Sequence, residues 1–154
     1  MIQSPADESA GDGLVCGDGE LETEVRAEVE RLGISDSVVM HGNVSDISGM
    51  YSRSAMLLLC SHMEGLPLVL IEAMHNGMPV VSTDCPYGPA DIIRDGENGF
   101  LVPMNDDVAF VRAVSILIEK PSLREGMREK ARETSARFSK QVIINSWKEL
   151  FLRR

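Results

Sequence analysis

Apolar and polar positions follow two alternating patterns from residue 14 onward. Five short apolar runs predict strands near residues 14–17, 38–41, 56–60, 79–82 and 100–102. Between and after these runs, apolar residues recur at spacings of three and four, which predicts helices over 20–32, 68–76 and 106–119. Short strands that alternate with helices indicate an α/β fold, here a Rossmann-like doubly wound parallel sheet.

Turn and capping residues set the boundaries of several predicted helices. Gly33 ends the first helix as a C-terminal cap. Ser45 or Asp46 caps a short helix that reaches about residue 53. Pro121 opens a helix at its first turn, and Ser139 caps the last helix of the chain. The region after residue 106 is therefore predicted to be entirely helical.

Residues 1–13 follow neither pattern. They are polar and small, so we expect an unpatterned leader over 1–13 and one domain over 14–154. The leader lacks the basic and apolar regions of a signal peptide. No apolar run approaches the length that a membrane-spanning helix needs.

Composition and charge narrow the class of protein. A chain of 154 residues with 44% hydrophobic residues is long and apolar enough to form one globular domain. Its net charge of −9 argues against nucleic acid as a partner, because phosphate binding needs clustered Lys and Arg. The basic residues between Arg124 and Arg154 alternate with acidic ones, which is typical of solvated helix faces.

Cysteine and histidine show no metal-ligand spacing, so no metal site is expected. Cys16 and Cys60 fall in predicted strands and are expected to be small buried residues, whereas Cys85 lies in a loop and is expected to be exposed. Free thiols favour a reducing, cytoplasmic setting. Trp147 and Phe151, four positions apart on the last helix, are expected to pack on the domain.

Two glutamates carry the candidate chemistry. Glu64 follows the strand near 56–60 in a glycine-containing turn, and Glu72 lies eight positions later, roughly one turn inside the next helix. Ligands of parallel α/β sheets bind at the carboxyl ends of strands, where helix N-termini point. The two carboxylates and the N–H groups between them therefore predict a site for an extended ligand that has hydroxyls and an anionic group.

The same stretch resembles a known family. Residues 64–74, EGLPLVLIEAM, and 77–83, GMPVVST, are similar to the donor-binding, C-terminal half of retaining GT-B glycosyltransferases of family four. The hallmark of that family is a pair of glutamates separated by seven residues. Ordered landmarks at 15–19, 41–44 and 91–102 also resemble it, and the loop 85–89, CPYGP, is similar to that of members that build bacterial surface polysaccharides.

The resemblance implies roles for individual residues. Glu64 is expected to be the catalytic residue and to accept hydrogen bonds from the donor sugar, and Glu72 to bind the ribose hydroxyls. The N–H groups of Gly65, Leu66 and Leu68 would face the diphosphate and sugar. Backbone near Asn43 and Val44 would contact the base. These residues form the expected nucleotide-sugar site: Asn43, Val44, Glu64, Gly65, Leu66, Leu68 and Glu72.

Two departures from the family set further expectations. The acceptor half that opens a full enzyme is absent, and residues 1–13 contain neither the arginine nor the lysine that hold the donor diphosphate. The strand that should precede residue 14 is also not visible in the leader. Either the flanking strands meet directly or the leader fills the gap poorly, and we predict a central position that is empty, closed up or filled by another chain.

The function expected from the resemblance is sugar transfer in bacterial polysaccharide biosynthesis. The donor would be a nucleotide-diphosphate sugar, a UDP-sugar by preference, with no cofactor, and the acceptor a glycan or a lipid-linked glycan. The chain alone is expected to be inactive, the full enzyme to lie at the inner face of the membrane, and an incomplete sheet to self-associate. Two alternatives remain open: a non-catalytic module that completes a separate acceptor-half chain, and an α/β sugar-phosphate enzyme of epimerase type.

Overall fold

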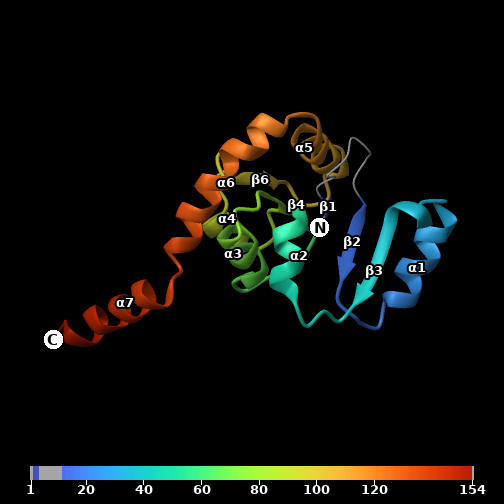
Figure 1. The fold of residues 1–154 in the computed structure, drawn as a ribbon. Helices are drawn as coiled ribbons and strands as arrows, with labels where there is room; N and C mark the ends of the chain where they lie inside the picture. The colour runs from blue at the N-terminus through green and yellow to red at the C-terminus, as the bar shows by residue number, and fades with distance from the viewer. Residues whose placement is uncertain (1, 4–11, 154) are drawn as a thin grey trace. The chain divides into compact units, whose positions relative to one another are not determined.

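The computed structural model describes residues 2–3 and 12–153, with only the backbone of residues 2 and 3. The chain divides into two compact units, Met1–Leu58 and Leu59–Arg154. Strand β4 (Ser54–Leu59) ends at the boundary between them. Figure 1 shows the succession of helices and strands along the chain.

The first unit is built on four strands with the order β3-β2-β1-β4. Strand β2 (Gly13–Cys16) pairs in parallel with β3 (Val38–Gly42), and Leu14 lies opposite Val39. Helix α1 (Glu22–Arg31) and the short 3₁₀ helix η1 (Ser35–Ser37) connect these two strands. This parallel βαβ connection is the one predicted from the apolar pattern.

The leader supplies a strand that the sequence did not predict. Strand β1 (Ile2–Gln3) pairs antiparallel with β2 on one side and with β4 on the other. The prediction that this position is empty, closed up or filled by another chain was therefore wrong, because the leader itself occupies it. The strand has only two residues, so the leader fills the gap for a short length, which agrees with the alternative that it fills the gap poorly.

Helix α1 forms where predicted, but its apolar stripe is largely exposed. None of its residues is buried, and Leu21 and Leu32 at its ends are 62% and 52% exposed. Gly33 follows with a φ of 68°, and its N–H donates to the carbonyl of Glu30. This left-handed conformation is the predicted C-terminal cap.

Helix α2 (Ile47–Arg53) brings the chain into β4. Of the two predicted caps, Asp46 is the one used: its side chain accepts a hydrogen bond from the N–H of Gly49 at 3.0 Å. Met50 and Tyr51 are the buried residues of this helix, and Met56 of β4 is fully buried. The short helix therefore contributes two side chains to the core of the first unit.

The second unit holds the pair of parallel strands β5 (Val80–Thr83) and β6 (Gly99–Val102). A side chain on Gly99 would place its Cβ within 2.3 Å of the carbonyl oxygen of Val80, so only glycine permits this close pairing. Helix α3 (Leu68–His75) precedes β5, and the one-turn helix α4 (Pro89–Ile92) precedes β6. Strands β5 and β6 and helix α3 lie at the positions predicted from the sequence.

Three helices complete the second unit: α5 (Asp107–Glu119), α6 (Pro121–Ala136) and α7 (Lys140–Leu152). Helix α5 packs on β5 and β6, and α3 packs against α6. The fully buried side chains Leu70 of α3 and Leu117 of α5 lie in this core. Burial of a leucine side chain contributes about 1.5–3 kcal/mol each, so these helix–sheet and helix–helix contacts carry much of the stability.

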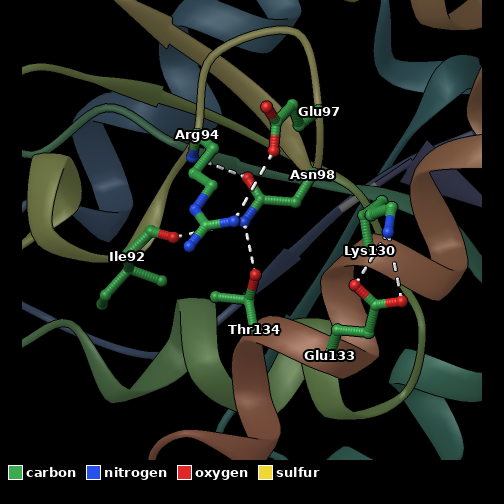
Figure 2. A network of polar contacts seen from close by, with 7 residues as sticks. All are labelled: Ile92, Arg94, Glu97, Asn98, Lys130, Glu133 and Thr134. Atoms are coloured by element: carbon green, nitrogen blue, oxygen red, sulfur yellow. Dashed lines mark hydrogen bonds and ion pairs between the residues drawn. The ribbon is translucent and has the colours of Figure 1, made fainter.

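Asn98 ties the turn before β6 to helix α6, as Figure 2 shows. Its carbonyl oxygen accepts from the N–H of Arg94 at 2.9 Å, and its amide donates to the carbonyl of Ile92 and to the hydroxyl of Thr134. The side chain is 1% exposed. Each polar atom of this buried amide therefore has a partner, as burial requires.

Helix α7 differs from the other helices of its unit. It has no buried residue, and Trp147 and Phe151 are 55% and 71% exposed. The two rings stack on each other with centroids 5.7 Å apart. The expectation that they pack on the domain was therefore wrong, because within the described residues their main aromatic contact is with each other.

Candidate functional site

The loop between β4 and α3 holds Glu64 through a short chain of hydrogen bonds. The hydroxyl of Ser61 donates to Oε1 of the half-buried Glu64 at 2.6 Å. The carbonyl of Ser61 in turn accepts from the hydroxyl of Thr83, the last residue of β5, at 2.8 Å. The position of the carboxylate thus depends on the carboxyl end of a neighbouring strand, where parallel α/β sheets bind ligands.

A second contact supports the same loop from the turn after β5. Gly88 has a φ of 91°, and a Cβ at this position would lie 2.4 Å from Cδ of Pro67 and 2.7 Å from the carbonyl oxygen of Gly65. The backbone of this turn therefore lies directly against the Gly65–Pro67 turn. Tyr87 beside it also has a positive φ, 67°, and its side chain is 78% exposed. An aromatic residue in this conformation is uncommon, so the turn is held by its surroundings.

Helix α3 begins four residues after Glu64, so its amino end directly follows the loop that carries this glutamate. Pro67 is the N-cap and has no capping side chain, and its carbonyl accepts from the N–H of Leu70. Within residues 12–153, no hydrogen bond of the chain uses the N–H groups of Gly65, Leu66 or Leu68. Unpaired N–H groups at a helix N-terminus carry partial positive charge and can bind an anion.

Glu72 lies on the solvent side of α3. The buried residues of this helix are Leu70, Ala73 and Met74, whereas Glu72 itself is exposed. Glu64 and Glu72 therefore belong to the same unit, one just before the helix and one within it. That the two carboxylates line one crevice remains a prediction.

The other two predicted site residues belong to the first unit. Asn43 and Val44 directly follow β3, and Asn43 is exposed while Val44 is half-buried. They thus lie after the carboxyl end of a parallel strand, which is the edge expected for base contacts. Their contact with a base remains a prediction.

Sequence reasoning did not identify Ser61 and Thr83 as supports of Glu64. Both are small hydroxyl residues that directly follow adjacent predicted strands, and this position is the signal that could have identified them. Side chains at the carboxyl ends of neighbouring parallel strands meet at one edge of a sheet. Which hydroxyl bonds to which partner depends on the loop conformation, and the strand pattern does not contain it.

The expectations for Cys60 and Cys85 were wrong, and Cys16, expected to be buried, is half-buried. Cys60 is exposed because it stands one residue beyond the end of β4, and Cys85 is 3% exposed because its loop turns inward. The immediate surroundings of the Cys60 sulfur nevertheless desolvate it. This desolvation, and then the negative charge of Asp107, raise the pKa of the Cys60 thiol above its ordinary value. The thiol is therefore protonated at neutral pH, which makes it a poor nucleophile.

Neither a metal centre nor a membrane span is formed by the described part of the chain. Across residues 12–153, no cluster of three His, Cys, Asp or Glu side chains is arranged to hold a metal ion. None of the helices that the structure describes has the length and apolarity to cross a bilayer.

Comparison with known proteins places this arrangement in a family. The family model "Glycosyl transferases group 1" matches residues 13–134. An exopolysaccharide phosphotransferase of Streptomyces coelicolor is 40% identical over 138 residues, which are 89% of this chain and 15% of that protein. The amylovoran biosynthesis glycosyltransferase AmsD of Erwinia amylovora is 31% identical over 137 residues, 89% of this chain and 38% of AmsD.

The fold leads to the same family. A variant of TarM from S. aureus, solved in complex with fondaparinux, α-GlcNAc-glycerol and UDP, superposes with a TM-score of 0.87 at 26% sequence identity. The match covers 94% of this chain and 30% of TarM. The chain thus has the fold of the C-terminal domain of GT-B glycosyltransferases and spans well under half the length of these relatives. It belongs to the glycosyl transferases group 1 family.

Proposed function

We propose that this chain binds the nucleotide-diphosphate sugar of a retaining glycosyltransferase, as its donor half. The observation that carries the proposal is the position of Glu64, held by Ser61 next to the unpaired N–H groups of Gly65, Leu66 and Leu68. A carboxylate that only accepts hydrogen bonds lies beside groups that only donate them. A sugar with hydroxyls, attached to a diphosphate, offers a partner to each kind of group.

The proposed roles follow from this chemistry. Glu64 accepts hydrogen bonds from the hydroxyls of the donor sugar, and the N–H groups at the start of α3 face the diphosphate. Glu72 accepts from the ribose hydroxyls, and the backbone of Asn43 and Val44 contacts the base. UDP is the favoured nucleotide because the matching TarM variant was solved with UDP. No cofactor and no metal ion take part in this proposal.

The proposed reaction moves the sugar with retention of configuration. The bond between the anomeric carbon and the diphosphate oxygen breaks, and the electron pair leaves with the diphosphate. An acceptor hydroxyl forms the new bond on the same face of the sugar and passes its proton to the departing diphosphate oxygen. Charge accumulates on the leaving diphosphate in the oxocarbenium-like transition state, and positioned N–H dipoles at the start of α3 stabilise it there.

The acceptor of the proposed reaction is a glycan or a lipid-linked glycan of a bacterial polysaccharide. AmsD, a relative at 31% identity, is named for the biosynthesis of such a polymer, amylovoran. Synthesis on a lipid-linked acceptor would place the full enzyme in the cytoplasm, at the inner face of the membrane. The isolated chain should turn over little, because an acceptor half is not among its residues and residues 1–13 offer the diphosphate no arginine or lysine.

A second candidate is a non-catalytic module that binds a nucleotide sugar and completes a separate acceptor-half chain. The observation that favours it is that residues 1–13 contain neither the arginine nor the lysine expected to hold the donor diphosphate. The two candidates differ in turnover but share the donor site. Transfer assays with and without the product of a neighbouring reading frame that encodes an acceptor half distinguish them.

Calorimetric titration of the 154-residue chain with UDP-, GDP- and ADP-sugars tests the donor site. Glu72→Ala should weaken binding of the preferred nucleotide sugar by about 1.5–3 kcal/mol, the usual worth of hydrogen bonds to a charged group. Glu64→Ala should weaken binding of the nucleotide sugar but leave binding of the free nucleotide unchanged, since the proposed partners of Glu64 are on the sugar. Glu30→Ala, an exposed glutamate of α1, is the matched control. Failure of the wild-type chain to bind any of these donors would refute the proposal.

A further inference from the structure

A cavity of about 350 Å³ lies in the second unit, beyond the carboxyl ends of the strands. Its lining comes from the residues after β4, the end of β5, the loop after β6 and the first turns of α5. Its volume falls within the range of small-molecule sites, about 300–1,000 Å³. The predicted site residues Glu64 and Glu72 are not among those that line it.

The walls of this cavity combine an apolar surface with hydrogen-bond acceptors. Phe110 and Met104 are half-buried and give apolar surface. Asp107 is exposed at the start of α5, and no residue between 12 and 153 forms a hydrogen bond or ion pair with its carboxylate. One carboxylate oxygen of the neighbouring Asp106 instead accepts a hydrogen bond from the N–H of Ala109 at 2.9 Å. Asp107 is therefore the carboxylate available to a ligand.

The charge of the lining disfavours an anionic ligand. Two aspartates, Asp106 and Asp107, line the cavity, and none of the described residues that line it is lysine or arginine. A diphosphate would be repelled there, whereas a neutral molecule with hydroxyl donors would be attracted. A covalent intermediate is also disfavoured, because the Cys60 thiol in the wall is held protonated by its raised pKa.

The cavity adjoins the loop that carries Glu64. Ser61 and Thr83 both line it. The hydroxyl of Ser61 donates to the Glu64 carboxylate at 2.6 Å, and the hydroxyl of Thr83 donates to the carbonyl of Ser61 at 2.8 Å. A ligand in the cavity would therefore lie next to the supports of the proposed catalytic residue. A second substrate in the cavity would therefore lie close to the sugar being transferred if Glu64 binds that sugar.

We propose that this cavity binds a neutral pyranose ring of the acceptor glycan, with the ring face on Phe110 and a hydroxyl donating to Asp107. A pyranose has an apolar C–H face and a rim of hydroxyls, which match the aromatic and acidic walls. The inference rests on the proposed glycosyltransferase function. It assigns part of acceptor recognition to this chain, in addition to the donor site.

The experiment is an NMR titration of the ¹⁵N-labelled chain with the methyl α-glycosides of glucose, galactose and N-acetylglucosamine. At least one glycoside should shift the amide signals of residues 105–111, and a saturating UDP-sugar should leave this binding intact. Asp107→Asn and Phe110→Ala should each weaken it about tenfold, the effect of one lost charge-assisted hydrogen bond or one lost stacking surface. Val108→Ala, on the same helix but outside the lining, is the matched control.

The outcomes separate this inference from the donor-site proposal. If UDP-sugars bind but no glycoside shifts residues 105–111 at tens of millimolar, the acceptor inference is overturned and the donor proposal stands. Glycoside binding that Asp107→Asn leaves unchanged also overturns it, even where Phe110→Ala fails to fold. Displacement of the glycoside by the UDP-sugar would mean that the cavity takes the donor sugar instead, which contradicts the inference as well.

Discussion

The hydroxyl of Ser61 lies 2.6 Å from the carboxylate of Glu64 and donates a hydrogen bond to it. Ser61 is itself held by Thr83 at the end of β5, so a strand of the sheet determines where the carboxylate points. Hydrogen bonds to ionised groups are short and about twice as strong as neutral ones. The fold itself thus holds Glu64 in position.

Ser61→Ala should therefore weaken donor binding, although Ser61 itself is not proposed to contact the donor. Loss of one hydrogen bond to the carboxylate frees Glu64 to rotate, and we expect the affinity for the UDP-sugar to fall about tenfold. Affinity for UDP should not change, because Glu64 is proposed to bind only the sugar. Calorimetric titration of both ligands measures the difference, with Ser48→Ala, an exposed serine of α2, as control. Equal losses for UDP and UDP-sugar would contradict this assignment.

Gly88→Ala should disturb the Gly65–Pro67 turn. The new methyl group would lie 2.4 Å from Cδ of Pro67 at a φ of 91°, so both strain and a clash are introduced. Gly96→Ala is the matched control, because its φ is 77° but nothing lies within 4 Å of its Cβ. In the control, only the left-handed strain should lower the free energy of unfolding, by about 1–2 kcal/mol.

The clash at Gly88 should add about 1–3 kcal/mol to that loss. Urea unfolding of the two variants measures the free energy of unfolding, and their difference isolates the clash from the strain. The Gly88 variant should also lose affinity for the UDP-sugar, since the displaced turn carries N–H groups of the proposed site. If both alanine variants unfold at the same urea concentration, the close approach of the two turns is wrong.

Asn98→Ala should destabilise the second unit. It removes three hydrogen bonds and leaves the N–H of Arg94, the carbonyl of Ile92 and the hydroxyl of Thr134 without these partners. We expect the free energy of unfolding to fall by about 2–4 kcal/mol. Thr134→Val removes only one of the bonds and should cost about 1 kcal/mol.

A double-mutant cycle between Asn98 and Thr134 tests the bond directly. The two residues should show a coupling energy of about 0.5–1.5 kcal/mol in urea unfolding. Glu97→Gln, which removes the exposed 3.8 Å ion pair with Arg94, is the control and should change stability by less than about 0.5 kcal/mol. Additive effects at Asn98 and Thr134 would argue against the interaction seen in Figure 2.

Asp107→Asn should speed alkylation of Cys60. Desolvation and the charge of Asp107 both raise the pKa of this thiol, so less thiolate is present at a given pH than for an ordinary cysteine. Removal of the negative charge lowers the pKa toward its ordinary value and increases the thiolate fraction. Iodoacetamide labelling at pH 8, followed by peptide mass spectrometry, measures the rate. Asp91→Asn serves as control, and an unchanged rate in Asp107→Asn would place the aspartate away from the thiol.

Trp147→Ala should leave the stability of the chain almost unchanged. The side chain is 55% exposed on a helix with no buried residue, so we expect a change below about 0.5 kcal/mol. Met127→Ala on α6, whose side chain is 2% exposed, should instead lose about 2–5 kcal/mol. Thermal and urea unfolding compare the two variants. A large loss in Trp147→Ala would show that α7 packs on the rest of the chain.

The elements that the sequence predicted correctly depend on local chemistry. The helix with Leu70, Ala73 and Met74 on one face forms as α3, because apolar residues at helical spacing build one buried stripe. Asp46 caps α2 because a carboxylate at this position can accept from an N–H three residues later. The five predicted strands appear as β2 to β6 for a similar reason, since each is a short apolar run between turn residues.

The sequence failed where distant parts of the chain decide the outcome. The two residues of β1 have no strand pattern of their own and pair because β2 and β4 offer unpaired edges. Cys60, expected to be buried, is exposed because it lies just past the end of a strand. Cys85, expected to be exposed, is buried although it lies in a loop. The aromatic residues of α7 repeat at helical spacing, yet no surface of the described chain covers them.

By itself, the sequence determined the order of the strands from β2 to β6, the family and the candidate pair Glu64 and Glu72, because periodicity and short motifs reside in neighbouring residues. Only the tertiary structure decided that Ser61 and Thr83 hold Glu64, that Gly88 lies against Pro67 and that Asp107 faces a cavity. These contacts join residues from separate elements of the second unit. They arise when parallel strands end at one edge of a sheet, which no local pattern encodes.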